Sequence, residues 1–321
     1  MPRTHRCLML LAAALAAPVA AQSYPSKPVR IVVPYAPGGT TDILTRAVGP
    51  KLTEAWGQPI IVDNRPGASG MIGAEIAAKA PPDGYTLLMS YTAEIAITVS
   101  LFKKISYDPL RDLAPISLGA VTPLILVVHP SLPVKSVKEL IALARAKPKA
   151  LPYASAGNGS PAHLAFELMQ RSGKIELTHV PYKGAAPAVV DLVGGHVVMF
   201  FSGMPPAMPH VRSGRMRALA VSTAKRSPAA PEVPTMAESG MPGFDIPTWF
   251  GLFAPAATPR EVITKVHGDF VKALGASDVK ARLIPEGAEP SPMTPEQFGQ
   301  FVRSETAKYA QIIRDSNIKP D

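Results

Sequence analysis

The sequence predicts an α/β protein built as two lobes with a cleft between them. Short β-branched runs alternate with helical patterns along almost the whole chain, and they fall into two series of modest size. With 321 residues and 47% hydrophobic content, the chain can bury a core in each lobe. The alternation favours open, mainly parallel sheets covered by helices, which bind ligands beyond the carboxyl ends of their strands.

The first series begins with a strand at residues 29–35. The helix that follows has Leu44, Val48 and Leu52 on its apolar face, with Pro50 as an expected kink. A strand and turn (59–70), a helix (71–80) and a strand (85–91) complete this series.

The second series begins with a strand at 124–130 and a helix at 137–146, which Ser136 is expected to cap. A strand, loop and helix follow over 151–173, with Ser160 as N-cap and Pro161 in the first helical position. Residues 176–205 then give strand, helix and strand, and the last sixty residues give helices at 259–274, 278–283 and 295–315. We expect residues 22–122 and 223–321 to form the first lobe and 123–222 the second, with crossings near 121–124 and 220–223.

The N-terminus has the pattern of a secretory signal peptide over residues 1–21. Arg3 and Arg6 precede an apolar stretch, and small residues end at Ala21, the expected cleavage site. Cys7, the only cysteine, falls within this leader. The mature chain is therefore expected to be periplasmic, soluble and free of disulfides.

The net charge of +9 and the pI near 9.6 would suit an acidic small molecule, an anionic surface or nucleic acid. However, the Lys and Arg residues are scattered, and neither a zinc-finger spacing nor an RNA-binding signature is present. Nucleic acid is therefore not an expected partner.

The stretch VVPYAPGGTTDILTRAV, residues 32–48, passes from a strand through two glycines into a helix. Gly38 and Gly39 let the backbone approach a ligand, and Thr40 or Thr41 is expected to cap the helix. The helix N-terminus would then direct N–H groups and its positive dipole end at the cleft. Asp42, in the first turn, is interpreted as structural. The stretch could equally be an ordinary tight turn, so a second loop is needed to decide.

A second loop, SAGNGSPAH over residues 155–163, repeats this design and also fits a dinucleotide fingerprint. That fingerprint requires an acidic residue about 20 positions on, whereas the next strand here leads to Tyr182 and Lys183. A cation at this place suits an anionic ligand better than a ribose.

Catalysis is not expected. Ser155, Ser160 and His163 could be drawn into a hydrolase triad, but no G-x-S-x-G elbow is present, and the histidines lack metal-ligand spacing. We therefore predict no catalytic residue, no metal and no cofactor. Met199, Met204 and Met208, with Phe200 and Phe201, could line a pocket, but a methionine-rich core segment is the favoured interpretation.

Nine motifs occur in order along the mature chain, among them VVPYAPGGTTDILTR, IIVDNRPGASGMIGA, YASAGNGSPAHLAFE and VPYKGAAPAVVDLVGGHV. Together they resemble the Bug family of periplasmic receptors, the TctC-like solute-binding components of tripartite tricarboxylate transporters. The resemblance implies a type II periplasmic binding protein, a two-lobed Venus flytrap that holds a small carboxylated ligand between its lobes.

The resemblance also implies which residues bind the ligand. They lie on the loops between strands and helices. The first lobe supplies Tyr35, Pro37, Gly38, Gly39, Thr40, Thr41, Asp42, Ser90, Thr92 and Ala93. The second supplies Ser155, Gly157, Asn158, Gly159, Ser160, His163, Tyr182, Lys183, Gly184 and Ala185.

The chain departs from the family pattern at one place: the family often has Asp after VMF, whereas this chain reads Phe200-Phe201-Ser202-Gly203. A carboxylate there could pair with the ammonium of an amino acid, and a serine cannot. We therefore expect a ligand without an ammonium group, such as a dicarboxylate or an aromatic acid.

The sequence thus favours an extracytoplasmic receptor, expected to be a monomer, that delivers an organic acid to membrane permease subunits. A sensory receptor of the same fold that signals to a membrane kinase is the alternative, and an exported hydrolase is a third possibility.

Overall fold

The computed structural model describes residues 24–316 and 318–319 of the chain. The predicted leader, residues 1–21, lies outside the described residues. Within the described part, no helix is long and apolar enough to cross a membrane.

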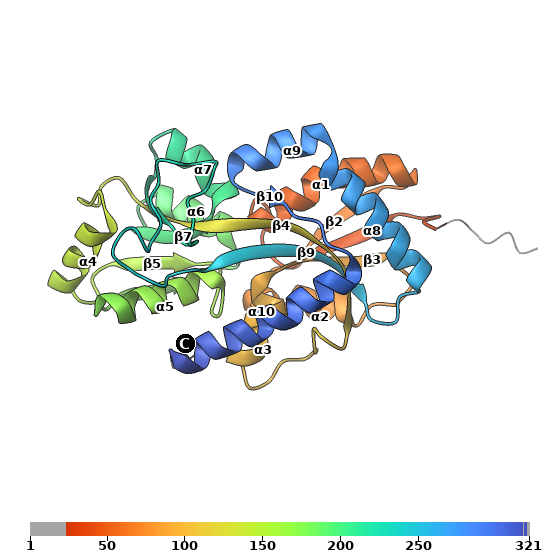
Figure 1. The fold of residues 1–321 in the computed structure, drawn as a ribbon, viewed down its shortest axis with the longest axis horizontal. Helices are drawn as coiled ribbons and strands as arrows, with labels where there is room; N and C mark the ends of the chain where they lie inside the picture. Colours follow the sequence, from red (N-terminus) through yellow and green to blue (C-terminus); the bar gives the residue numbers. More distant parts are fainter. Residues whose placement is uncertain (1–23, 317, 320–321) are drawn as a thin grey trace, which may run out of the picture.

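Two lobes share one pair of long strands, β4 (Leu113–Val128) and β9 (Pro247–Pro255), which run through the middle of the molecule (Figure 1). The strand order is β2-β1-β3-β9-β4-β7-β5-β6, with β8 and β10 also paired to β4. The first part of β4, up to Pro123, pairs with β9, and its last part, from Leu124, pairs with β7 and β8. A single strand therefore belongs to both sheets.

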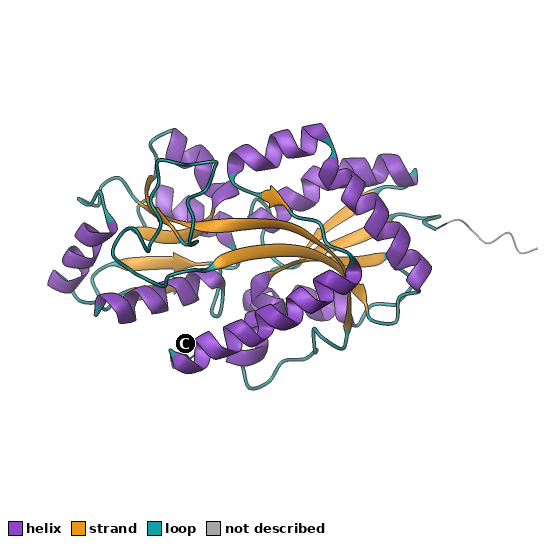
Figure 2. Ribbon diagram, viewed as in Figure 1, coloured by secondary structure: helices purple, strands orange, loops and turns teal. Residues whose placement is uncertain are grey.

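The first lobe contains the elements before β4 and after β9. These are β1 (Val29–Val33), α1 (Thr40–Trp56), β2 (Ile60–Asn64), the 3-10 turn η1 (Ala68–Gly70), α2 (Met71–Ala78), β3 (Thr86–Tyr91), the π-helical segment η2 (Ala93–Ile97), α3 (Thr98–Leu101), α8 (Arg260–Gly275), α9 (Ser277–Leu283), the 3-10 turn η3 (Ile284–Glu286), β10 (Glu289–Pro290) and α10 (Pro295–Asp315). Helices cover the sheet of this lobe on both sides (Figure 2).

The second lobe contains the elements between the two long strands. These are α4 (Val137–Ala146), β5 (Pro152–Ser155), α5 (Pro161–Gly173), β6 (Thr178–Pro181), α6 (Ala185–Val193), β7 (Met199–Gly203), α7 (Met204–Arg212) and β8 (Arg217–Val221). Ser136 and Ser160 cap α4 and α5 by accepting backbone N–H groups of Glu139 and His163, as the sequence predicts.

The strand directions differ from the prediction of mainly parallel sheets. β1 pairs in parallel with β2 and β3, and β5 with β6 and β7, but every pairing of β4 and β9 is antiparallel. Strands that are joined through a covering helix pair in parallel. The strands that connect the lobes, β4 and β9, are not part of such strand–helix–strand units, so the alternation in the sequence does not predict their direction.

The sequence predicts that the chain returns to the first lobe near 220–223, and the contacts of the segment that follows favour a later return. Met236 N–H donates to the Val221 carbonyl, and the Phe244 ring stacks 5.9 Å from Phe201. Residues 223–246 therefore pack on the second lobe. We propose Pro247, the first residue of β9, as the point of return, and residues 121–124 of β4 as the outward crossing.

A continuous apolar core joins the two lobes. One buried cluster includes Leu88 and Ile95 of the first lobe together with Phe166 and Phe201 of the second, and a second cluster lies between the first sheet and helices α1, α8 and α9. The cleft is therefore backed by a packed wall.

Candidate ligand-binding site

Helix α1 begins at the cleft without a side-chain cap. Its N-cap is Gly39, not the predicted Thr40 or Thr41, and no side chain accepts a hydrogen bond from the first turn. The N–H groups at such a helix start remain available to an anion, and the dipole favours negative charge there. The sequence thus places a helix start here correctly, but it assigns the capping residue wrongly.

Asp42 supports this loop from behind. Its carboxylate accepts hydrogen bonds from Gly38 N–H (3.0 Å), Arg46 Nε (2.9 Å) and Asn64 Nδ2 (3.0 Å). Burial alone would raise the pKa of Asp42, but these three donors lower it below its usual value. The carboxylate is thus occupied and ionised, and it fixes Gly38, whose φ of 87° favours glycine.

Two helices of the second lobe, α6 and α7, also begin at uncapped glycines. Gly184 is the N-cap of α6 and Gly203 that of α7, and neither helix has a side-chain cap. A Cβ atom on Gly39 would lie 3.9 Å from the backbone nitrogen of Ala185, and one on Gly203 would lie 2.5 Å from Thr40 Oγ1. Three helix starts from the two lobes therefore converge.

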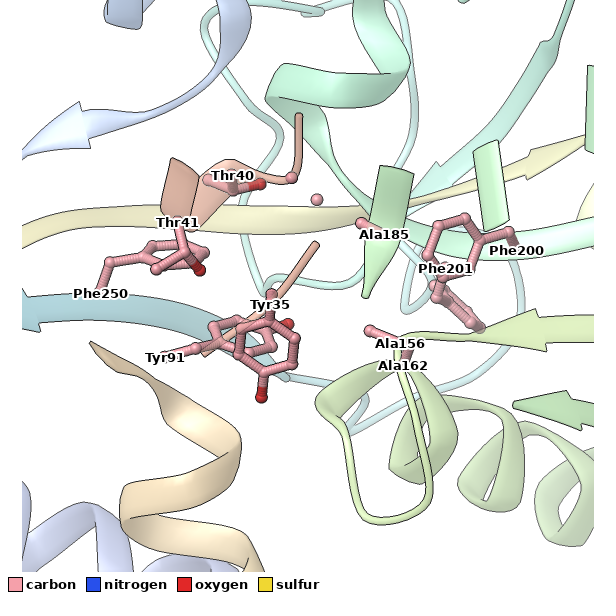
Figure 3. A pocket seen from close by; sticks show the side chains of 12 residues that line it. Tyr35, Thr40, Thr41, Tyr91, Ala156, Ala162, Ala185, Phe200, Phe201 and Phe250 are labelled. Carbon is pink, nitrogen blue, oxygen red and sulfur yellow. The ribbon is translucent and has the colours of Figure 1, made fainter. Parts of the chain in front are cut away.

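The helix starts surround a small cavity between the lobes (Figure 3). It is lined by Tyr35, Gly39, Thr40, Thr41, Tyr91, Ala156, Ala162, Ala185, Phe200, Phe201, Gly203 and Phe250. Of the residues that form this lining, none carries a formal charge. A ligand here would meet backbone N–H groups, threonine hydroxyls and ring faces.

Aromatic side chains form the apolar wall of the cavity. Tyr91 and Phe250 stack with ring centroids 4.9 Å apart, and the Tyr35 ring meets Tyr91 edge-on at 5.6 Å. Phe200 and Phe201 lie on the opposite side, from strand β7 (Figure 3). This arrangement fits a ligand with an anionic end and a short apolar body.

A second, wider chamber adjoins the cavity and shares Tyr35 and Ala156 with it. The turn over residues 67–71 lines it together with Gly157, Asn158, Tyr182 and Lys183. Contacts between the lobes close its sides: Ala36 N–H donates to the Lys183 carbonyl (3.1 Å), and Ser69 Oγ donates to the Asn158 carbonyl.

The predicted site residues fall into three groups. Tyr35, Gly39, Thr40, Thr41 and Ala185 line the cavity, and Gly157, Asn158, Tyr182 and Lys183 line the adjoining chamber. The remaining predicted residues line neither space: Pro37, Gly38, Asp42, Ser90, Thr92, Ala93, Ser155, Gly159, Ser160, His163, Gly184 and Ser202.

The polar residues of this last group hold the framework together. Ser90 Oγ donates to the Gly251 carbonyl (3.0 Å), and Thr92 Oγ1 bonds to both the N–H and the carbonyl of Trp249, so both tie β3 to β9. Ser202 is fully buried and donates to the Gly203 carbonyl (2.9 Å).

The serines considered for a hydrolase have similar roles. Ser160 Oγ accepts His163 N–H as the cap of α5, and His163 Nδ1 accepts Gly159 N–H (3.1 Å). Ser155 Oγ lies 2.6 Å from His179 Nε2 but has no exposed surface. Ser160 and His163 thus serve the start of α5, and burial keeps Ser155 away from the cavity.

Seven lining residues are not among the predicted binding residues: Tyr91, Ala156, Ala162, Phe200, Phe201, Gly203 and Phe250. Tyr91 and Ala156 lie within the predicted loops 90–93 and 155–160, and Phe200 and Phe201 belong to the core and also line the cavity. Strand alternation could have indicated one of the seven: Tyr91 and its neighbour Ser90 must face opposite sides of the strand, so only one of the two can face the cavity. Phe250 is the cross-strand partner of Tyr91, but nothing local in the sequence shows that β9 pairs with β3.

Two α/β lobes connected by two crossing strands, with an uncharged cavity at their junction, define a solute-binding protein of the periplasmic type. The pattern of the tripartite tricarboxylate transporter family receptor matches residues 44–318, and the chain belongs to this family. It is 40% identical to protein BugT of Bordetella pertussis over 313 residues, which are 97% of this chain and 96% of that protein.

Solved structures agree with this assignment. An R. palustris protein with adipate is 38% identical and has a TM-score of 0.90, covering 93% of this chain and all of that one. MatC from Rhodopseudomonas palustris with bound malate is 33% identical and has a TM-score of 0.86, covering 90% of this chain and all of that one. The predicted two-lobed fold and the predicted family are thereby confirmed.

Proposed function

We propose that this receptor closes on a small organic acid without an ammonium group, a dicarboxylate or an aromatic acid, and delivers it to the permease subunits of a tripartite transporter. The observation that carries this proposal is the convergence of the uncapped starts of α1 and α6, at Gly39 and Gly184, on an uncharged cavity. The start of α7 after Gly203 adds at most the N–H of Met204, because Pro205 and Pro206 have none. A carboxylate accepts hydrogen bonds from such N–H groups and gains from the dipoles, at roughly 1.5–3 kcal/mol for each charge-assisted bond.

The body of the ligand is expected to rest on the aromatic wall. Tyr91 and Phe250 offer ring faces on one side, and Phe200 and Phe201 do so on the other. The relatives solved with adipate and with malate hold acids of this general kind. A longer acid would extend past Tyr35 into the adjoining chamber, toward Lys183.

The lack of an acidic lining residue supports the exclusion of amino acids. An ammonium group buried in the cavity would find no carboxylate partner, and an unpaired buried charge is costly. The nearest ionised carboxylate described above, that of Asp42, is already bound to three donors on the far side of its loop.

Ligand binding is expected to select the closed arrangement of the lobes. In the described part of the chain, β4 belongs to both sheets and the chain returns at the start of β9, so a change of backbone angle near these two crossing points would open the cleft. A ligand that contacts Thr40 and Ala185 together interacts with both lobes only when they are closed.

The test is thermal unfolding of the mature chain, from Gln22, with mono-, di- and tricarboxylates and amino acids. A ligand at about 100 times its Kd adds about 2.7 kcal/mol to the free energy of unfolding, which raises Tm by several degrees. A selective shift with one carboxylic acid, followed by calorimetry, would support the proposal. Tightest binding of glutamate or aspartate would contradict the exclusion of amino acids.

Delivery to permease subunits, export through a cleaved leader and a monomeric state are parts of the same proposal. A sensory receptor of this fold would bind the same ligand but would leave uptake of the acid unchanged when the gene is deleted. Turnover is not part of the proposed function, because the hydrogen bonds of Ser160 and His163 serve the capping of α5.

A further inference from the structure

Glu94 is a fully buried carboxyl group directly behind the cavity wall. It lies on η2, and its side chain contacts two tyrosines that line the cavity: Oε1 accepts Tyr91 N–H at 2.6 Å, and Oε2 lies 2.9 Å from Tyr35 Oη. In the described part of the chain, no Lys, Arg or His forms an ion pair with it. The binding site described above does not explain such a group.

The hydrogen bonds of the Tyr35 hydroxyl indicate whether the Glu94 carboxyl group is neutral or ionised. Tyr35 Oη lies 2.9 Å from the Ser69 carbonyl as well as 2.9 Å from Glu94 Oε2, so one phenol proton faces two acceptors. With Glu94 neutral, its O–H donates to Tyr35 Oη and Tyr35 O–H donates to Ser69, and all three oxygens are satisfied. With Glu94 ionised, one phenol proton serves two acceptors, so one of them loses its donor.

This chain of hydrogen bonds ends at the contact between the lobes. Ala68 and Ser69 have φ values of 47° and 52°, a left-handed conformation that is unfavourable for these residues. Tyr35 fixes the Ser69 carbonyl, and Ser69 Oγ donates to the carbonyl of Asn158 in the second lobe. The protonation of Glu94 is thus connected to the turn that closes on the second lobe.

The other titratable groups around Glu94 do not compete for this proton. Tyr35 and Tyr91 are buried and have raised pKa values, and so does Tyr107, which donates to the Glu94 backbone carbonyl at 2.5 Å. Burial raises the pKa of Glu94 to about 8, although its hydrogen bonds with Tyr91 and Tyr35 oppose the shift.

Helix α10 packs against η2, and three of its titratable groups are buried or half-buried, whereas the others are exposed. Glu305 accepts Trp249 Nε1 at 3.1 Å and lies 3.7 Å from Lys308, and Tyr309 donates to the Pro247 carbonyl at 3.0 Å. These partners account for all three groups without Glu94.

We propose that Glu94 is a positioning residue whose neutral form fixes the turn Gly67–Gly70 through Tyr35, so that the affinity of the cleft for its anion falls when Glu94 ionises. Two effects act in the same direction. Loss of the proton loosens the turn that contacts Asn158, and it places a negative charge behind Tyr35 and Tyr91, opposite a bound anion. The inference rests on the proposed binding of an organic acid.

The first test is the pH dependence of adipate and malate affinity, measured by calorimetry for the wild type and Glu94→Gln. Glutamine keeps the neutral pattern, because its N–H can donate to Tyr35 and its oxygen can accept Tyr91 N–H. We expect wild-type affinity to fall by about tenfold between about pH 7 and pH 9.5, and that of Glu94→Gln to change by less than about twofold. Equal profiles for the two proteins would overturn the proposal.

Glu305→Gln is the matched control, since Glu305 is also a buried glutamate with a hydrogen-bonded carboxylate. Its pH profile should follow the wild type. A flat profile in this variant as well would indicate that any buried glutamate has the effect, and it would refute a specific role for Glu94.

A second measurement needs no ligand and therefore separates this inference from the proposed function. Hydrogen exchange of the peptide that contains residues 67–71 is compared between wild type and Glu94→Gln at the same pH, so that the intrinsic exchange rate cancels. The ratio should be near one at about pH 6 and rise several-fold above about pH 8. If neither acid binds while this ratio rises, the ligand class is wrong and the role of Glu94 stands; a constant ratio refutes that role.

Discussion

Gly39 and Ala185 face each other across the cleft from the starts of two helices in opposite lobes. A Cβ atom on Gly39 would lie 3.9 Å from both the nitrogen and the Cβ of Ala185. The two helix N-termini are therefore close enough for one carboxylate to contact both.

Replacing Gly39 tests this geometry. Its φ of −78° suits any residue, and a Cβ would meet its neighbours at 3.7 Å or more. We expect Gly39→Ala to have little effect, whereas the methyl groups of Gly39→Val occupy the anion position and weaken binding by about tenfold, about 1.4 kcal/mol. Calorimetry and thermal unfolding check both variants, and unchanged affinity in Gly39→Val would remove this loop from the site.

The neighbouring Gly38 provides a contrast. Its φ of 87° disfavours a side chain, so Gly38→Ala should lower the free energy of unfolding by about 1 kcal/mol. Loss of stability at Gly38 and loss of affinity at Gly39 would separate the two roles of adjacent glycines.

Closure depends on the fit of Gly203 against Thr40. A Cβ on Gly203 would lie 2.5 Å from Thr40 Oγ1. Gly203→Ala should therefore weaken ligand binding by about 1 kcal/mol, and it should cost much less when Thr40→Ala has already removed the hydroxyl. A double-mutant cycle on ligand affinity measures this coupling, and a coupling energy of zero would show that the two residues do not meet in the bound state.

Lys183 is exposed at the rim of the adjoining chamber, and its fixed contribution to closure is its backbone carbonyl. We expect Lys183→Ala to weaken anion binding by no more than about threefold, with the effect vanishing at high salt, because exposed charges are screened. Lys147→Ala, at an exposed lysine on the outer end of α4, is the control. A large, salt-independent loss would instead indicate direct pairing of Lys183 with the ligand.

Glu94 should make stability depend on pH. The pKa of Glu94 rises from its ordinary value of 4.5 to about 8 on folding because of burial. The folded state thus holds a proton that the unfolded state has lost between these values, so stability falls as pH increases through this window, by roughly 1.4 kcal/mol per pH unit. Chemical unfolding from about pH 5 to pH 9 should show this slope in the wild type but not in Glu94→Gln.

Ser160 distinguishes a structural role from a catalytic one. Because Ser160 caps α5, Ser160→Ala should lower the free energy of unfolding by about 1 kcal/mol and Tm by about 2–4 °C. Thr294→Ala, at the capping box of α10 far from the cleft, should cost a similar amount. Any ester or amide hydrolysis that disappears in the Ser160 variant alone would revive the hydrolase alternative.

Most helices and strands could be predicted from local patterns. Helix α4 begins after Ser136 and α5 after Ser160 because a serine, a following apolar periodicity and, for α5, a proline in the first turn act over a few residues. The predicted strand at 124–130 covers only the second-lobe end of β4. The first part of β4 contains Pro115, Gly119 and Pro123, and proline and glycine are uncommon inside strands, so local patterns do not predict it.

The sequence by itself determined the two lobes, the family and the loop that carries Gly39, because each depends on neighbouring residues or on motifs in fixed order. Only the tertiary structure decided which side chains form the cavity wall and which serve the framework. Tyr91 and Phe250 meet because β3 pairs with β9, across more than 150 positions of chain. Ser90, the neighbour of Tyr91 in β3, points away and binds that same strand, since successive side chains of a strand face opposite sides.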